Sequence, residues 1–253
     1  LWPPLVPFLR SLDVHPGCAA IELITHGAID PAPFLPPLRR LTRLTAIKIS
    51  LESADRATND AVRGAGHFDR VMEHLPRWRE DFDKRIVLMA TLGRHNIAGI
   101  GELIALSRRL KIDGLILERF VPLGGGQAMA GEALTETEWS GVATTVATVA
   151  DVECDGLKSY RAFWLRFEDG EIELDAAACN LGSSSMAVMP DGTVYPCRRL
   201  PEPIGRLPAD DIGAILDQLD RHAVSKDPGC GICPALERAR AAILKRFGSI
   251  CSG

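Results

Sequence analysis

Short apolar stretches alternate with helical stretches along the first part of the chain. Four stretches have the length and apolar character of buried strands, at residues 20–25, 44–51, 85–91 and 114–120. Apolar residues at helical spacing lie between and after them, at residues 33–41, 67–78, 97–110 and 135–150. Thr135 or an adjacent residue is expected to cap the last helix. This order predicts βα units with a parallel sheet and crossover helices, an α/β fold.

The chain opens on a further helical pattern. Apolar residues recur at helical spacing at Trp2, Leu5, Phe8, Leu9 and Leu12. The sequence starts with Leu1 and without methionine, in the middle of that pattern. We therefore expect the first residues to continue a longer protein.

The pattern changes after about residue 151. Alternating segments flank an Asp-Gly pair within residues 159–174, and a second hairpin signal lies at Pro190-Asp191-Gly192. A helix is expected at 209–222, a tight loop at 230–233 and a last helix at 234–247. We expect a first domain at residues 1–150 and a smaller one at 151–253.

Composition narrows the class of protein without naming it. Of 253 residues, 46% are hydrophobic and 25% are charged, as in ordinary globular proteins. The formal net charge of −4 gives no support for a nucleic-acid partner. No apolar run reaches the roughly 18 residues of a membrane span, and no signal peptide opens the chain. We expect a cytoplasmic protein with no membrane partner.

The cysteines gather in the last third of the chain. Five of the seven lie there, at Cys179, Cys197, Cys230, Cys233 and Cys251. In a cytoplasmic protein such a group favours metal binding over disulfides, and thiolates suit zinc or an iron–sulfur cluster. The other two, Cys18 and Cys154, are expected to be small buried apolar residues.

The cysteine-rich part resembles a known domain. Cys179, twelve residues, Gly192, four residues and Cys197, followed by Cys230-Gly231-Ile232-Cys233, is similar to the auxiliary-cluster domain of radical S-adenosylmethionine enzymes. That domain is called SPASM or, in its shortened form, twitch. The resemblance implies a [4Fe-4S] cluster on these four cysteines. A second cluster that uses Cys251 stays open as an alternative.

The first part of the chain resembles the partial (β/α)6 TIM-like barrel of the same family, without its first strands. The segments "ELITHG", "ISLESADRATNDAVRGAGHFDRV", "MATLGRHNIAGI" and "ERFVPLGGGQ" are similar to its motifs after the third to sixth strands. The resemblance implies a set of residues that contact S-adenosylmethionine: Thr25, Ser50, Arg63, Val121 and Leu123. Three have simpler alternatives, because Ser50 can end a strand, Arg63 can pair with Asp60 or Glu52, and Thr25 can bond nearby backbone.

One expected motif is not in the sequence. The family holds its catalytic [4Fe-4S] cluster with Cys-x-x-x-Cys-x-x-Cys, a spacing that these residues do not contain. The catalytic-cluster cysteines are thus not assigned to any residue here. We expect this chain to be part of a longer enzyme and to be inactive alone.

The resemblance implies an activity and partners. The longer enzyme would cleave S-adenosylmethionine reductively to a 5′-deoxyadenosyl radical, which abstracts hydrogen from a peptide or small-molecule substrate. Peptide or protein modification and small-molecule dehydrogenation both remain open, and a flavodoxin or ferredoxin would supply electrons. The alternative is a non-catalytic scaffold that binds zinc or an iron–sulfur cluster.

The glycine-rich segment, the histidines and one pair of arginines give less specific signals. The glycines at 124–126 are expected to form a flexible loop, since no Lys-Ser or Lys-Thr follows to suggest a phosphate site. The six histidines show no metal-ligand spacing and are expected at the surface or at helix caps. Arg198 and Arg199 follow a candidate ligand and are expected to contact cluster sulfides, an anionic substrate or solvent.

Overall fold

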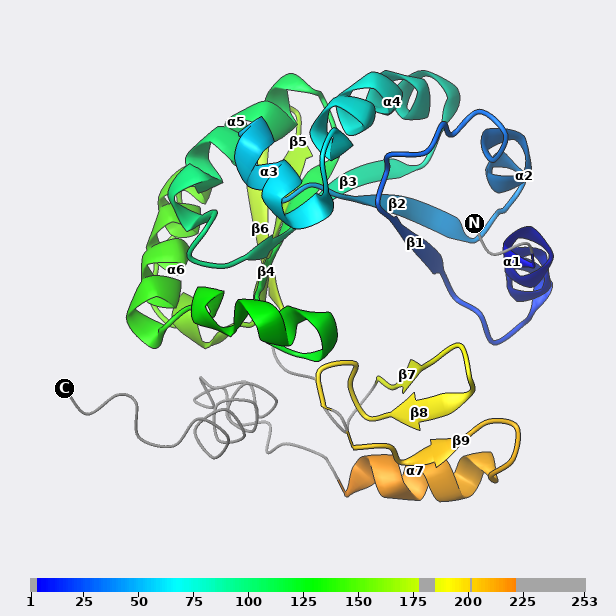
Figure 1. Cartoon of the computed structure of the whole chain (residues 1–253). Helices are drawn as coiled ribbons and strands as arrows, with labels where there is room; N and C mark the ends of the chain where they lie inside the picture. The colour runs from blue at the N-terminus through cyan, green and yellow to red at the C-terminus, as the bar shows by residue number, and fades with distance from the viewer. Residues whose placement is uncertain (1–3, 178–184, 201, 222–253) are drawn as a thin grey trace.

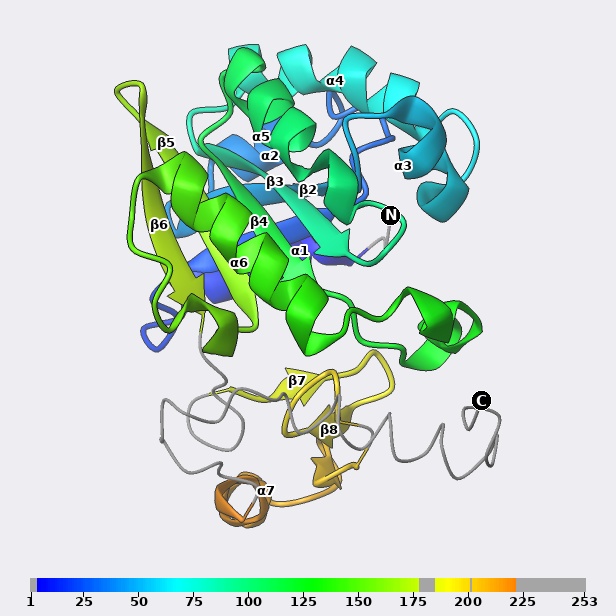
Figure 2. The ribbon, with the colours of Figure 1, turned by 90° about the vertical axis from the view of Figure 1, so that its left-hand side faces the viewer.

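The computed structural model describes residues 4–177, 185–200 and 202–221. These residues form a six-stranded sheet in the order β1-β2-β3-β4-β5-β6 and a three-stranded sheet in the order β7-β8-β9. The small sheet and α7 lie on one side of the large sheet in both views (Figures 1 and 2). The expected loop at 230–233 and helix at 234–247 fall outside the described residues, as does Trp2.

The four expected strands are present and parallel. They are β1 (Ile21–Thr25), β2 (Leu44–Ser50), β3 (Arg85–Leu92) and β4 (Gly114–Arg119). Each pairs in parallel with the next. Their bounds lie within one residue of the expected ones, which confirms a mixed α/β fold with a parallel sheet.

Helices follow the strands as the apolar spacing predicts. They are α2 (Leu35–Arg39), α4 (His67–Asp81), α5 (Ile100–Arg109) and α6 (Glu136–Ala150), with a short 3-10 turn η1 (Ile97–Gly99) before α5. The expected first helix is α1 (Leu5–Val14). Thr135 caps α6, because its hydroxyl accepts from the Glu138 N–H while the Glu138 carboxylate accepts from the Thr135 N–H.

Apolar spacing does not predict α3 (Arg56–Arg63) or the 3-10 segment η2 (Gly124–Glu132). Helix α3 is mostly polar and contributes only Asn59 as a buried residue, so it has no apolar stripe to detect. Its signal is a cap: the Asp55 carboxylate accepts from the Thr58 N–H at 2.8 Å. This bond holds the pKa of Asp55 below its usual value.

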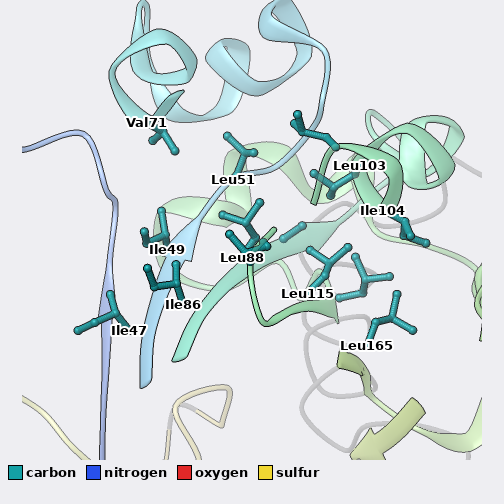
Figure 3. Close-up of a cluster of buried hydrophobic side chains, with 14 of the residues drawn as sticks. Ile47, Ile49, Leu51, Val71, Ile86, Leu88, Leu103, Ile104, Leu115 and Leu165 are labelled. Atoms are coloured by element: carbon teal, nitrogen blue, oxygen red, sulfur yellow. The ribbon is translucent and has the colours of Figure 1, made fainter. Parts of the chain in front are cut away.

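One face of the large sheet carries the hydrophobic core, and we call it the helix face. On β2 and β3 it consists of Ile47, Ile49, Ile86 and Leu88, none of which has exposed surface. They pack with apolar residues of the surrounding helices in one continuous cluster (Figure 3). Successive strand residues point to opposite faces, so this core uses every second position.

The other face, which we call the open face, carries a different set of side chains. Register pairing places Lys48 beside Val87 and Gly114, Ser50 beside Met89, and Thr91 beside Glu118. Buried residues of this face, such as Val87 and Ile116, do not belong to the core cluster. The open face is therefore partly polar, with Lys48, Ser50, Thr91, Glu118 and Trp164.

The large sheet extends past the boundary expected near residue 151. After the short turn η3 (Leu157–Ser159), the strands β5 (Ala162–Glu168) and β6 (Glu171–Ala177) form an antiparallel hairpin. Strand β5 pairs with β4, and its Phe163 and Leu165 are fully buried in the main core. The Asp169-Gly170 turn was expected, but its membership of the large sheet was not, because alternation alone does not name the partner strand.

The second hairpin is present in the small sheet. Strand β7 (Ala187–Val188) pairs with β8 (Thr193–Tyr195), which pairs with β9 (Gly205–Arg206), and α7 (Ile212–Asp220) follows. Gly192 adopts a positive φ of 85°, and a Cβ there would lie 2.0 Å from the Leu207 carbonyl oxygen. Only glycine therefore fits this turn. Among the described residues of this part, Val194, Ile204, Ile215 and Leu219 form a buried cluster.

No described helix is both long and apolar enough to cross a lipid bilayer.

Candidate functional site

Polar side chains and loops gather where the parallel strands end. Thr25, Ser50 and Thr91 lie at or near the carboxyl ends of β1, β2 and β3, and Val121 follows β4. The carboxyl ends of parallel strands meet at one edge of a sheet, where α/β proteins commonly bind ligands. This edge thus holds three of the five residues expected to contact the cofactor, Thr25, Ser50 and Val121.

Ser50 is the most suggestive of these residues. It lies on the open face and is 7% exposed. Its hydroxyl forms no hydrogen bond with any described residue. The Ser50 hydroxyl oxygen is not among the fully enclosed side-chain atoms that lack a partner in the described part of the chain. It is a hydroxyl at the end of a strand, with no hydrogen-bond partner among the described residues, where α/β proteins bind ligands.

Thr25 is occupied locally. Its hydroxyl oxygen accepts a 3.3 Å hydrogen bond from the Gly27 N–H, which is the alternative role named above. Gly27 has a φ of 75°, and a Cβ there would come within 2.4 Å of the Ile49 methyl group. The turn after β1 therefore requires glycine and brings the backbone close to β2.

Arg63 pairs with the carboxylate of Glu52. Its Nε donates to Glu52 Oε1 at 2.7 Å and its Nη2 donates to the same oxygen. Glu52 Oε2 accepts from the Thr91 N–H at 2.7 Å, and the Glu52 side chain is 1% exposed. This is one of the two pairings that the sequence left open. A contact of Arg63 with cofactor remains a proposal.

Two asparagines complete the surroundings of Glu52. Asn59 Oδ1 accepts from the Glu52 N–H at 3.0 Å. Asn96 Nδ2 donates to the Glu52 carbonyl at 2.9 Å and to the Thr91 carbonyl at 3.1 Å. The loops after β2 and β3 are thereby tied together through buried amides.

His67 extends this network to the loop after β1. Its Nδ1 lies 3.1 Å from Asn59 Nδ2, and its Nε2 lies 2.8 Å from the His26 carbonyl oxygen. An amide nitrogen and a carbonyl demand an accepting Nδ1 and a protonated Nε2, which is the neutral imidazole. Burial is the main cause that lowers the pKa of His67.

The expectation that all histidines lie at the surface or at caps was wrong for two of them. His67 is 3% exposed and His74 is 9% exposed. Both histidines belong to α4. One face of this helix packs on the core, and residues next to that face are buried with it.

The glycine-rich segment after β4 is fastened to the loop after β3. Val121 and Leu123 are partly buried, and Leu123 N–H donates to the Val121 carbonyl at 2.9 Å. Glu132, at the end of η2, accepts from the His95 N–H at 2.8 Å. Arg94 donates to Glu138 at 2.7 Å, and this bond, together with those from Thr135, lowers the pKa of Glu138 to about 2. The segment forms 3-10 helical turns that are interrupted at Met129, where an irregular loop was expected.

Of the expected cluster ligands, the described residues include Cys197 alone. Cys179, Cys230, Cys233 and Cys251 fall outside them. Cys197 is partly exposed, and its sulfur accepts from the Arg199 N–H at 3.4 Å. Among the described residues, no group of three His, Cys, Asp or Glu side chains is placed to hold a metal ion. The four-cysteine cluster therefore stays a prediction.

Cys18 and Cys154 are not buried. Cys154 is exposed beside Thr144, and Cys18 is partly exposed. Each lies in a connection between elements, where its side chain is not enclosed by the core.

No family model matches the chain, and no curated protein matches it. Solved structures do. SuiB of Streptococcus suis, bound to S-adenosylmethionine, aligns with a TM-score of 0.59 and 14% identity over 92% of this chain and 56% of its own. The enzyme anSMEcpe, with bound AdoMet and the Cp18Cys peptide, aligns with a TM-score of 0.59 and 12% identity, over 86% and 64% of the two chains.

Both neighbours have solved structures with bound S-adenosylmethionine. The chain shares their fold. At 12% to 14% identity the likeness concerns the fold only, and the chain spans less than two thirds of either neighbour. What the site does must be argued from its own residues.

Sequence reasoning missed Asn59, His67 and Glu118 as parts of the site. Asn59 and His67 lie in or beside the polar segment that was read only as a motif around Arg63. Glu118 lies one residue before the end of the buried strand β4 and is the register partner of Thr91. A charged residue near the carboxyl end of a parallel strand is itself a sign of a ligand site, and this sign was available in the sequence.

Proposed function

We propose that this chain is part of a radical S-adenosylmethionine enzyme, and that the carboxyl edge of β1–β4 holds the cofactor. The observation that carries the proposal is Ser50, a residue at the end of β2 whose hydroxyl has no partner among the described residues, on a fold shared with two proteins whose structures hold S-adenosylmethionine. Hydroxyl and backbone groups at this edge fit the polar and adenine parts of S-adenosylmethionine. When bound at a reduced [4Fe-4S] cluster, that molecule supplies a 5′-deoxyadenosyl radical for hydrogen abstraction.

In this proposal each residue has a separate task. Ser50 donates a hydrogen bond to the cofactor, while backbone and apolar atoms of Val121 and Leu123 contact the adenine. Thr25 and Gly27 shape the turn that borders the site. Arg63 has a partly exposed side chain, so it can approach the cofactor while Glu52 holds its Nε and Nη2.

The buried network beneath these residues keeps the edge rigid. Glu52, Asn59, Asn96 and His67 bond the loops after β1, β2 and β3 to one another. Binding sites gain from such support because loops held in one arrangement lose less freedom when a ligand binds. We assign these four residues a positioning role.

The cysteine-rich part is proposed to hold an auxiliary [4Fe-4S] cluster on Cys179, Cys197, Cys230 and Cys233. The motif spacing in the sequence supports it. The large sheet is proposed to be a partial barrel, followed by a SPASM or twitch domain. Peptide is the favoured substrate class, since SuiB and anSMEcpe have structures with bound peptide. A cytoplasmic location and a flavodoxin or ferredoxin partner complete the proposal.

A test compares two proteins: these 253 residues, and the same chain together with any sequence its gene encodes before Leu1. Both are reconstituted anaerobically with iron and sulfide, reduced with dithionite and assayed for 5′-deoxyadenosine. The 253 residues should form a cluster but no 5′-deoxyadenosine, because they lack Cys-x-x-x-Cys-x-x-Cys. The longer protein should cleave the cofactor.

Two results would contradict the proposal. One is 5′-deoxyadenosine from the 253 residues themselves. The other is a longer protein that binds only zinc and never cleaves the cofactor, which would favour the scaffold alternative.

A further inference from the structure

One glutamate on the open face is surrounded by three arginines. Glu118 lies near the carboxyl end of β4 and its side chain is 11% exposed. Its Oε2 accepts from Arg198 Nη2 at 2.5 Å and from Arg199 Nη2 at 2.8 Å. Its Oε1 lies 3.7 Å from Arg161 Nη1. We call these four residues the arginine group.

The arginine group has an excess of positive charge. The guanidinium groups of Arg198 and Arg199 share one carboxylate oxygen of Glu118, which leaves one positive charge on these three side chains. Among the described residues, Glu118 is the only carboxylate that pairs with Arg198 or Arg199. A single Arg199–Glu118 pair would suffice to fasten the segment after Cys197 to β4. The second guanidinium group, that of Arg198, brings a like charge close to Arg199, and an added anion would offset that repulsion.

The two arginines that follow Cys197 differ in how far their side chains are exposed. The side chain of Arg199 is 10% exposed, whereas that of Arg198 is 58% exposed. Arg199 is therefore fixed against Glu118, while Arg198 remains accessible from solvent. A guanidinium group has five N–H donors in a planar fork, so Arg198 can bond Glu118 and a second anion together.

Its position connects the group with the proposed site. Glu118 is the register partner of Thr91, whose N–H bonds Glu52, and it shares the open face with Ser50. Arg198 and Arg199 directly follow Cys197 in the chain. An anion held by Arg198 would lie between the carboxyl edge of β4 and the cysteine-bearing segment.

We propose that the arginine group binds a carboxylate group of the substrate. Proteins commonly bind carboxylates through bidentate hydrogen bonds from the planar guanidinium group of arginine. That the carboxylate belongs to a substrate rests on the proposed function, whereas the binding of a carboxylate to these arginines does not depend on it. The inference narrows the substrate class to acids, either an acidic small molecule or a peptide with an acidic side chain or free carboxyl end.

The test measures carboxylate binding to the purified chain by titration calorimetry, with no iron, sulfide or S-adenosylmethionine present. The probes are glutarate, a blocked tripeptide with a central glutamate, and an acetylated trialanine with a free carboxyl end. Sodium chloride at the same ionic strength and the matching glutamine tripeptide are the reference titrations. Arg198→Gln is compared with Arg56→Gln, which removes a guanidinium of similar exposure, 66%, on α3.

At least one carboxylate probe should bind at a single site, and Arg198→Gln should weaken that binding at least tenfold. Arg56→Gln should leave it unchanged. Tight binding by glutarate identifies a small acid, and tight binding by a tripeptide identifies a peptide carboxylate. The inference is overturned if no carboxylate binds better than chloride, or if the two variants weaken binding equally. Because no cofactor is present, its failure is distinct from failure to cleave S-adenosylmethionine.

Discussion

The two faces of the large sheet differ in what their residues contribute. On the helix face, Ile47, Ile49, Ile86 and Leu88 are fully buried among helices and belong to the main core. The open face carries the alternate positions of the same two strands, among them Lys48, Ser50 and Thr91. A shift of one residue separates the part of the sequence that stabilises the fold from the part that forms the site. Substitutions on the two faces should therefore have different effects.

Adjacent residues on β3 give the sharpest test of this difference. Leu88→Ala removes a fully buried side chain from the helix face and should lower the free energy of unfolding by about 4 kcal/mol. Met89→Ala, on the open face and partly exposed, should cost about 1 kcal/mol. Urea unfolding measures both. Equal losses would mean that the open face is as much a part of the core as the helix face.

The carboxylate of Glu52 is the main exception, because it stabilises the fold from a polar position. Glu52→Ala leaves Arg63 and the Thr91 N–H without their partner and should cost about 3 kcal/mol. Glu102→Ala, at an exposed position of α5, should change stability by less than about 0.5 kcal/mol. A loss for Glu52→Ala below about 1 kcal/mol in the same urea experiment would show that the network is not important for folding.

The described core of the small sheet is a cluster of four residues, so we expect its turn to matter more than any one of them. Gly192→Ala combines a strained φ with a contact of 2.0 Å to Leu207 and should cost about 2 kcal/mol. Gly170→Ala has a similar φ but open space, and should cost about 1 kcal/mol.

Hydrogen exchange locates these two losses. Gly192→Ala should expose the amides of Met189 and Gly192, which bond across the turn, and leave β1–β4 protected. Faster exchange throughout the large sheet would show that the two sheets unfold as one unit.

The pH dependence of stability reports on His67. Burial lowers the pKa of this histidine, so the unfolded chain binds its proton more readily than the folded chain. The stabilisation is complete above the unfolded pKa of about 6.5 and decreases as the pH falls below it towards the lower folded value. Unfolding at pH 7.5 and pH 5.5 should show a loss that His67→Gln abolishes. Carboxylates titrate at lower pH and should not contribute in this interval.

The fold was largely predictable from apolar patterns, and the site only in part. Buried strands such as residues 85–91 are recognisable from their apolar residues, and Thr135 indicates the start of a helix because it is a typical N-cap residue. Helix α3 has no apolar stripe, and the partner strand of β5 depends on tertiary packing, so neither follows from local sequence. Ser50 could be named from a motif, whereas the pairing of Glu118 with Arg198 and Arg199 joins residues 80 and 81 positions apart.

The central claim is that the open face at the carboxyl edge holds S-adenosylmethionine. It is tested most directly by the KM for that molecule in the cleavage-competent protein, measured for Ser50→Ala and Ser107→Ala. Both serines are buried, but Ser107 bonds the Leu103 carbonyl within α5, on the helix side. Ser50→Ala should raise KM about tenfold, the equivalent of one hydrogen bond of roughly 1.4 kcal/mol, without loss of stability. Ser107→Ala should leave KM unchanged. An unchanged KM for Ser50→Ala, or an equal rise for both variants, would contradict the account.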